Sequence, residues 1–104
     1  MNEIDISIII VNYNVKDFLF QCLKSIEKAE QNLNVEVIVV DNNSTDGSAN
    51  YLSPLFPRVK FIALEENLGF GKANNLGFKQ AKGKYFLILN PDTILEENTL
   101  LVMK

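Results

Sequence analysis

The sequence predicts an α/β fold in which a mostly parallel four-stranded sheet carries helices on both faces. Runs typical of strands alternate with runs typical of helices, in the order βαβαβαβα. Helical connections between consecutive strands make those strands parallel and place helices against the two faces of the sheet. The length of 104 residues and the hydrophobic fraction of 47% suit one small domain with its own core, so residues 1–104 are expected to form a single domain.

The expected strands are four short apolar runs at residues 4–11, 35–40, 59–64 and 84–89. The first of them ends in a continuous β-branched stretch, Ile8-Ile9-Ile10-Val11, which is typical of a strand buried on both faces. Between the strands, apolar residues recur at helical spacing or turn-forming residues cluster. The first pattern predicts helices and the second predicts the loops that join them to the strands.

The expected helices lie at residues 15–29, 48–53 and 70–82, and a fourth begins at residue 96. Asn14 is in position to cap the first helix, with Asp17 three residues later in the position of a capping box. Pro54 is expected to end the second helix because proline cannot continue its hydrogen-bond pattern. Gly83 follows the third helix and is expected to adopt the left-handed conformation that ends many helices.

Composition excludes several classes of function. A net charge of −3 does not favour nucleic acid or an anionic membrane surface as a partner. The chain has no histidine, which removes Ser-His and Cys-His nucleophile pairs and histidine metal ligands. Its single cysteine, Cys22, falls in an apolar helical pattern and is expected to lie in the core. Without a basic leader or an apolar run of ~18 residues, a cytoplasmic location is expected, with membrane-peripheral association as the alternative for a full-length protein.

Polar residues gather where the expected strands end. Asn12-Tyr13-Asn14 follows the first strand, a segment rich in Asp and Asn begins at Asp41 after the second, and a Glu-, Asn- and Gly-rich loop follows the third. Asn90-Pro91-Asp92 follows the fourth. In open α/β sheets, ligands bind outside the carboxyl ends of the strands. Each cluster alone is equally consistent with a turn, but four of them on one edge predict a binding site.

Two of these clusters suggest contacts with a nucleotide. Asp41 directly follows an apolar strand, so its carboxylate is expected at the sheet edge, where it would accept hydrogen bonds from a base or a ribose. The alternative is an Asx turn closed by Ser44 or Thr45. The Gly-x-Gly-Lys segment that ends at Lys72 is neither a Walker loop nor a dinucleotide fingerprint. The helix that begins there and the Lys72 ammonium would favour a phosphate, and a plain glycine turn is the alternative.

The Asn90-Pro91-Asp92 segment is a candidate metal site. Pro91 fixes its own φ and disfavours the helical conformation at Asn90. An extended chain would present Asn90 and Asp92 on the same side. Mg²⁺ takes oxygen ligands, usually one or two carboxylates together with substrate phosphates. Asn90 and Asp92 meet that description, although a simple turn would also explain the three residues.

Four segments together resemble the N-terminal half of family 2 glycosyltransferases with the GT-A fold, a Rossmann-like three-layer sandwich. They are SIIIVNYN at 7–14, VIVVDNNSTDGS at 37–48, NLGFGKANNLGFKQAKGKY at 67–85 and LILNPD at 87–92. The Asn-Pro-Asp version of the usual Asp-x-Asp element is similar to the rhamnosyltransferase-type branch. The resemblance implies inverting transfer of a sugar from a UDP-, GDP- or dTDP-linked donor to an acceptor hydroxyl, with Mg²⁺ or Mn²⁺. The sugar and the acceptor stay open, and cell-surface polysaccharide synthesis is the expected setting.

The resemblance also implies roles for individual residues. One segment lines the base pocket, one carboxylate binds the base, and others help to hold the nucleotide. The residues that match these positions are Val11, Asn12, Tyr13, Asp41, Asn43, Lys72, Asn75 and Asn90, with Asp41 as the base-binding carboxylate. Asp92 matches the metal ligand of the Asp-x-Asp element. Asparagine at position 90, where many members have aspartate, removes one negative charge and is expected to weaken metal binding.

The catalytic base is the part of the reaction that no residue of this sequence matches. In the family an Asp or Glu of the second half activates the acceptor hydroxyl, so the base is expected beyond Lys104 and the chain is expected to bind donor but to turn over poorly. The alternative function is a stand-alone, non-catalytic nucleotide-binding or assembly module, and the natural reading frame would discriminate between the two. A homodimer is also expected, because apolar surface on the fourth strand would lack its cover.

Overall fold

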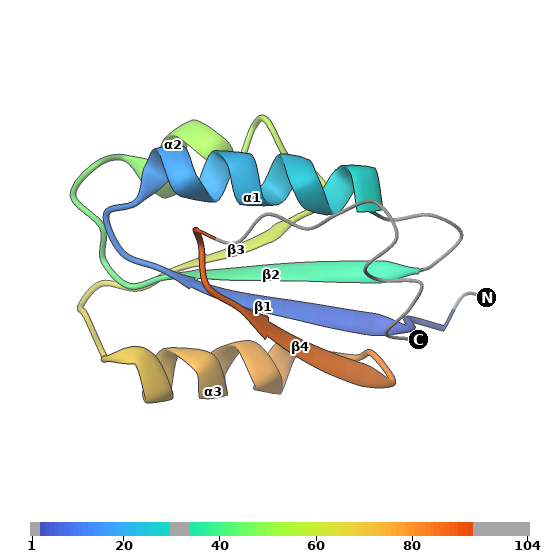
Figure 1. Ribbon diagram of the computed structural model, residues 1–104. Coiled ribbons are helices and arrows are strands. Elements are labelled where there is room, and N and C mark those ends of the chain that lie inside the picture. The colour runs from blue at the N-terminus through green and yellow to red at the C-terminus, as the bar shows by residue number, and fades with distance from the viewer. Residues whose placement is uncertain (1–2, 30–33, 93–104) are drawn as a thin grey trace.

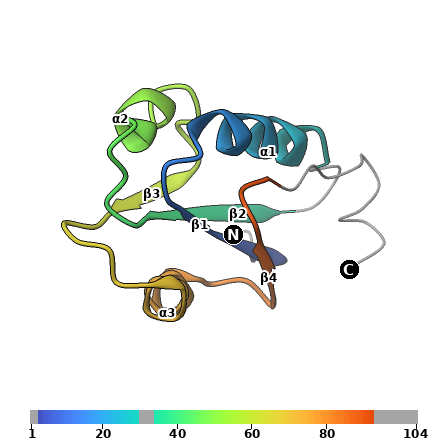
Figure 2. The ribbon, with the colours of Figure 1, turned by 60° about the vertical axis from the view of Figure 1, so that its left-hand side comes forward.

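The computed structural model describes residues 3–29 and 34–92. Their elements are β1 (Ile6–Asn12), α1 (Lys16–Ala29), β2 (Val35–Asp41), α2 (Ser48–Leu52), β3 (Lys60–Ala63), α3 (Phe70–Gln80) and β4 (Tyr85–Leu89), each within two residues of its predicted bounds. The four strands form one sheet in the order β3-β2-β1-β4, and every neighbouring pair is parallel. Figures 1 and 2 show α1 and α2 over one face of the sheet and α3 over the other. The predicted α/β architecture is therefore confirmed, and the helix predicted from residue 96 lies outside the described residues.

The core consists of two apolar layers, one on each side of the sheet. All seven residues of β1 are buried because helices cover both of its faces. On the α1 side the layer includes Ile10 and Leu23, and on the α3 side it includes Val40 and Ala73. Gly77 brings α3 close to the sheet, since a Cβ at that position would lie 2.6 Å from Cγ2 of Ile9. The continuous apolar runs of the sequence are explained by this double coverage.

The strand register places two polar residues side by side at the carboxyl edge of the sheet. Ile6 pairs with Val35 at the start of β1 and β2, and the pairing continues in step to Asn12 opposite Asp41. Both polar residues end their strands, so they lie where ligands bind in open α/β sheets.

Gly83 serves a different purpose from the one predicted. Among the described glycines, only Gly47 and Gly69 have positive φ, so the left-handed helix end predicted at Gly83 is wrong. The helix α3 ends at Gln80, before Gly83 is reached. A Cβ at Gly83 would lie 2.6 Å from the backbone nitrogen of Ser7, and the Gly83 amide donates a 2.8 Å hydrogen bond to Ser7 Oγ. Glycine is required there for close approach to β1.

The predicted cap at Asn14 is also wrong. Helix α1 begins at Lys16, and the Asn14 backbone has φ of 55°, a left-handed conformation that asparagine tolerates. Its side-chain Oδ1 accepts a 2.7 Å hydrogen bond from the amide of Thr45, a residue of another loop. The first amide of the helix, that of Lys16, instead donates to Asp46 Oδ2 at 3.0 Å. A residue from the loop after β2 therefore caps α1.

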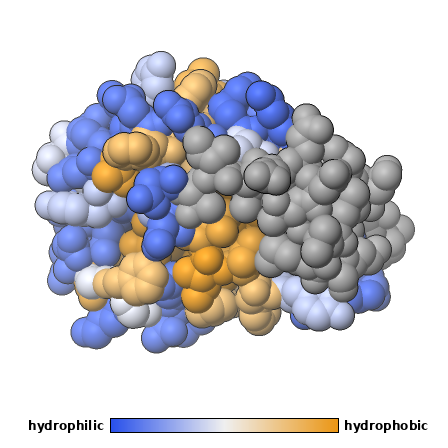
Figure 3. Space-filling model, viewed as in Figure 1, coloured by the Kyte–Doolittle hydropathy of each residue, from blue (hydrophilic) through white to orange (hydrophobic). Residues whose placement is uncertain are grey.

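Strand β4 forms one edge of the sheet within the part of the chain that the structure describes. Its side chains Leu87 and Leu89 join the apolar layer on the α1 side. Tyr85, Phe86 and Ile88 are 55%, 54% and 44% exposed. Figure 3 shows a broad apolar area over this part of the molecule. None of the described helices is long and apolar enough to cross a membrane.

Candidate functional site

The carboxylate of Asp41 is held by three hydrogen bonds at the end of β2. Oδ1 accepts from Asn12 Nδ2 at 2.8 Å and from Ser44 Oγ at 2.7 Å, and Oδ2 accepts from the Ser44 amide at 3.0 Å. The bonds from Ser44 show that the Asx-type turn is present. Asp41 is also only 5% exposed, so its carboxylate is fixed in place. Hydrogen bonds to a charged acceptor are stronger than neutral ones, which stabilises this buried charge. The side chain is thus a rigid acceptor rather than a freely projecting one.

The three residues predicted at the end of β1 have different environments. Asn12 is fully buried and positions Asp41, while its own Oδ1 has no hydrogen-bond partner among the described residues. Val11 lies in the apolar layer on the α3 side, with Ala73. Tyr13 is 49% exposed. Of the three, only Tyr13 is exposed, whereas Asn12 contacts the site through its hydrogen bond to Asp41.

A hollow of about 170 Å³ opens beside the Asp41 carboxylate. Asp41, Asn43 and Ser44 line one part of it, and Ala63 and Leu64 at the end of β3 line another, with the start of α2 completing the wall. The hollow therefore combines an anionic hydrogen-bond acceptor with apolar atoms. Such a combination suits a flat heterocycle that carries an N–H donor, because the ring contacts the apolar wall while the donor meets the carboxylate.

The loop that follows β2 is tied to the starts of both α1 and α2. Asp46 Oδ2 accepts from the Lys16 amide, and Asp46 Oδ1 accepts from the Ser48 amide at 2.9 Å and from the Ser48 hydroxyl. Burial alone would raise the pKa of Asp46, but the hydrogen bonds from Ser48 and Lys16, together with the Lys16 charge, lower the pKa below its ordinary value. Asp46 is therefore ionised at neutral pH and supports the loop that carries Asn43.

Asn42 ties the end of β2 to the start of α3. The side chain is 3% exposed, its Oδ1 accepts from the Leu68 amide at 2.8 Å, and its Nδ2 donates to the Gly69 carbonyl at 3.3 Å. This brings the N-terminal turn of α3 to the same edge as Asp41. Lys72, in that turn, and Asn75 are both exposed. They are not among the residues that line the hollow, and α3 covers the opposite face of the sheet from α2.

The Asn90-Pro91-Asp92 segment turns instead of continuing the strand. Strand β4 ends at Leu89, and Pro91 and Asp92 lie in a turn, so the extended platform predicted for Asn90 and Asp92 is wrong. Proline is favoured at the second position of such turns, which accounts for the difference. Figures 1 and 2 show the chain after β4 (red) bending toward the α1 face. Burial, and then the negative charge of Asp92, raise the pKa of the Cys22 thiol to about 11.

Asn90 and Asp92 are both exposed at this edge. Across residues 3–29 and 34–92, no group of three or more His, Cys, Asp and Glu side chains is arranged to hold a metal ion. One carboxylate and one amide fit a cation that takes most of its ligands from water and from phosphate oxygens. They do not fit a cation held by protein ligands alone.

Several residues of this site were not among the predicted contacts. Asn42, Ser44 and Asp46 organise the loops, and Asn74 is a buried side chain of α3 whose Oδ1 has no partner among the described residues. The density of Asp, Asn and Ser in residues 41–48 was the available signal. It indicated a structured loop, but it did not indicate which side chains bind ligand and which bind the other loops.

The chain is similar to known proteins over nearly its whole length. The model of glycosyl transferase family 2 matches residues 7–103. Glycosyltransferase GlyG of Streptococcus pneumoniae is 34% identical over 103 residues, which cover 96% of this chain and 34% of that protein. The crystal structure of S. aureus TarS 1–349 in complex with UDP-GlcNAc superposes with a TM-score of 0.85 at 30% identity, over 96% of this chain and 30% of that one.

A third likeness concerns the fold alone. Mannosyltransferase PcManGT from Pyrobaculum calidifontis, in complex with GDP-Man and Mn²⁺, superposes with a TM-score of 0.78 at 24% identity, over 96% of this chain and 31% of that one. The chain therefore spans about a third of the length of each of these three proteins. Because the family model matches nearly all of it, the chain belongs to glycosyl transferase family 2.

Proposed function

We propose that the chain binds the nucleotide of a nucleotide-diphosphate sugar and forms the donor-binding part of an inverting glycosyltransferase. The observation that carries this proposal is the fixed Asp41 carboxylate in the wall of the hollow at the carboxyl edge. Uracil, thymine and guanine each carry a ring N–H that donates to a carboxylate. The TarS structure, which is 30% identical to this chain over the matched residues, contains UDP-GlcNAc, and this supports a donor of this class.

The topology suggests how the donor would lie. Asp41 ends β2, Asp92 follows β4, and β1 lies between these strands. Neighbouring strands are about 4.8 Å apart, so the two ends are separated by about 10 Å, a distance that a ribose and its phosphates can bridge. Lys72 is the third residue of α3, where the helix N-terminus and the ammonium group both attract phosphate. The base would occupy the hollow beside Asp41, with the diphosphate directed across β1 toward Asp92.

We propose Mg²⁺ or Mn²⁺ as the cofactor, held by Asp92 with Asn90 and by the diphosphate oxygens. Such a cation supplies charge neutralisation for a leaving diphosphate. With one carboxylate, the protein contributes little affinity without the nucleotide, so metal and nucleotide should bind together. Asp92→Ala should abolish the metal dependence of nucleotide affinity, and Asn90→Asp should increase it. Metal-dependent affinity that persists in Asp92→Ala would show that the cation site is elsewhere.

The acceptor half of the reaction needs a general base, and none is assigned among the described residues. Inversion requires that a hydroxyl attack the anomeric carbon from the face opposite the leaving diphosphate, with an Asp or Glu to take its proton. We therefore propose that this chain alone transfers sugar only slowly. The rate at which it releases UDP from UDP-sugars measures this turnover. The rhamnosyltransferase-like identity rests on Asn90-Pro91-Asp92 alone, and a comparison of dTDP-rhamnose with UDP-GlcNAc as ligands tests it.

Calorimetry with UDP, GDP and dTDP, each with and without Mn²⁺, tests the donor proposal directly. At least one of the three should bind. A second ligand sharpens the test, because UDP methylated at N3 of uracil lacks the proton that would reach Asp41. We expect this analogue to bind at least tenfold more weakly than UDP, since a hydrogen bond to a charged group contributes about 1.5–3 kcal/mol. No binding of any nucleotide to folded protein would refute the proposal.

We also propose that two copies associate through β4. The strand has an unpaired edge in the described part of the chain, and its exposed Tyr85, Phe86 and Ile88 provide apolar surface around that edge. Exposed edges of this kind pair readily with other strands. Light scattering should show a dimer or a larger assembly, and Ile88→Lys should dissociate it. A monomer at all concentrations would contradict the proposal.

A further inference from the structure

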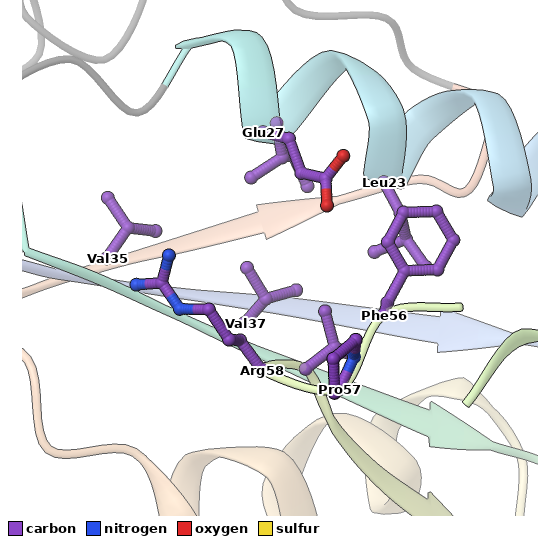
Figure 4. A pocket seen from close by; sticks show the side chains of 9 residues that line it. Leu23, Glu27, Val35, Val37, Phe56, Pro57 and Arg58 are labelled. Carbon is purple, nitrogen blue, oxygen red and sulfur yellow. The ribbon is translucent and has the colours of Figure 1, made fainter. Parts of the chain in front are cut away.

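We propose that the chain has a second small-molecule site, at the end of the sheet opposite to Asp41, which takes a carboxylate with a compact apolar body. A cavity of about 170 Å³ lies under the C-terminal half of α1, where β2 begins and the chain enters β3 (Figure 4). Val35, the first residue of β2, lines this cavity, whereas Asp41 is the last. Val37 also lines the cavity and is four steps of about 3.3 Å from Asp41, so about 13 Å of strand separates the two sites. The cavity is therefore distinct from the proposed nucleotide site.

The inner walls of the cavity are apolar and well packed. Leu23 and Ile26 of α1 form one wall and Val37 of β2 forms another, and all three side chains are buried. Phe56 forms a further wall and is held edge-on against Phe20, with 5.8 Å between the ring centroids. An apolar cavity of about 150 Å³ in another protein admits benzene, so this volume suits a body of about one six-membered ring.

A turn holds the only arginine of the chain at the opening. The Val59 amide donates to the Phe56 carbonyl at 3.0 Å, and Pro57 occupies the second position of the turn that this bond closes. Arg58 is the third residue of the turn, so its backbone position is set by the turn and by the proline. Figure 4 shows its guanidinium extending along the cavity toward Val35. Arg58 is exposed and forms no hydrogen bond or ion pair with any other described residue.

The charges at the opening favour an anion. Glu27 points toward the cavity from α1 in Figure 4, but its carboxylate already has a partner, the Lys24 ammonium, at 3.4 Å. The Arg58 guanidinium has no such partner in the described structure, so its charge is the uncompensated one. Guanidinium groups bind carboxylates through two parallel hydrogen bonds. A ring in the cavity with a carboxylate at the Arg58 guanidinium satisfies both the apolar walls and this charge.

Methyl NMR of the full chain tests the site with three ligands that share one ring: benzoate, benzyl alcohol and benzylamine. Benzoate should shift the methyl signals of Val37 and Ile26 in a saturable way, benzyl alcohol should do so more weakly, and benzylamine should not. Benzoate shifts confined to the loop that carries Asp41, or no saturation at all, would overturn the proposal. Saturating UDP should leave the benzoate shifts unchanged, so this test stands apart from the nucleotide test.

Substitutions at the opening separate charge recognition from simple filling of the cavity. Arg58→Gln should lower the affinity for benzoate by about tenfold, because a charge-assisted pair is lost, and should leave the affinity for benzyl alcohol unchanged. Glu27→Gln should raise the affinity for benzoate, since a neighbouring negative charge is removed. Lys79→Gln removes one positive charge from a remote exposed position and should change the affinity for neither ligand. Equal loss of benzoate affinity in Arg58→Gln and Lys79→Gln would show that only net charge matters and would refute the site.

Discussion

Replacing Asp41 by asparagine keeps the size of the side chain and removes its charge. In the structure, Oδ1 accepts from Asn12 Nδ2 and Ser44 Oγ, and Oδ2 accepts from the Ser44 amide. An asparagine amide has one oxygen and one NH₂ group. If its oxygen takes the place of Oδ1, its NH₂ faces the amide of Ser44, donor against donor. One of the three hydrogen bonds is then lost and a buried donor has no acceptor.

The expected losses of stability and of nucleotide affinity follow from these contacts. Leaving a buried polar group unpaired costs about 1–3 kcal/mol. In a domain of about 100 residues, 1 kcal/mol corresponds to about 4–8 °C in melting temperature, so Asp41→Asn should melt about 5–20 °C lower. If the carboxylate also accepts the ring N–H of a base, nucleotide affinity should fall by about 10- to 150-fold, because that bond is charge-assisted.

Calorimetric titration with UDP and thermal melts followed by circular dichroism separate the two effects. Ser44→Ala is the matched control, since it removes one hydrogen bond to Asp41 and keeps the charge, so it should lower the melting temperature with much less effect on affinity. A folded Asp41→Asn protein that binds UDP as well as the parent would refute the assignment of Asp41 to the base. An unchanged melting temperature would refute the strength assigned to its hydrogen bonds.

Three further predictions concern stability. Gly77→Ala should destabilise the fold, because overpacking against Ile9 costs about 1–3 kcal/mol and outweighs the helix propensity gain of about 1 kcal/mol; urea unfolding measures the difference. Gly83→Ala should also destabilise, since its Cβ would lie 2.6 Å from the backbone of β1, and a variant as stable as the parent would contradict that contact. The pKa of Asp46 is lowered in the folded protein by hydrogen bonds from Ser48 that outweigh its burial, so its contribution to stability is complete above pH ~4 and is lost as the pH falls through the folded pKa. Asp46→Asn should therefore flatten the acid side of a plot of unfolding free energy against pH, and an unchanged slope would argue against this linkage.

The features that could be predicted from the sequence are those determined by local pattern. A continuous run such as Ile8-Ile9-Ile10-Val11 has no exposed alternate positions, so it specifies a strand covered on both faces. The order of strands and helices then specifies a parallel sheet, and the carboxyl ends of the strands identify the edge on which a site forms. Asp41 and Asn43, which line the hollow at that edge, were both among the predicted contacts.

The features that could not be predicted depend on contacts between residues far apart in the sequence. Asn14 was in position to cap its own helix, but it binds Thr45, and Asp46 caps that helix in its place. These partners are about 30 residues apart, and no local pattern reports them. Gly83 illustrates the same limit. A glycine after a helix can be needed for a positive φ or for close approach to another segment of backbone, and only the position of Ser7 decides between the two.

The loops of the candidate site differ in how firmly they are held. Hydrogen bonds of side chains join the loops after β1, β2 and β3: Asn12 bonds to the Asp41 carboxylate, Asp46 to the Lys16 amide and Asn42 to the Gly69 carbonyl. Asn90, Pro91 and Asp92, the described residues after β4, form no hydrogen bond or ion pair with another described residue.

Groups that are already in place lose less conformational entropy when a ligand binds. Under the proposed function, the preorganised part of recognition is therefore the nucleoside end, beside Asp41. The phosphate and metal end, near Asp92, would depend on donor and cation binding together. Under the proposed function, a single carboxylate after β4 would suffice for a metal-dependent donor site, because the bound diphosphate would provide most of the affinity for the cation.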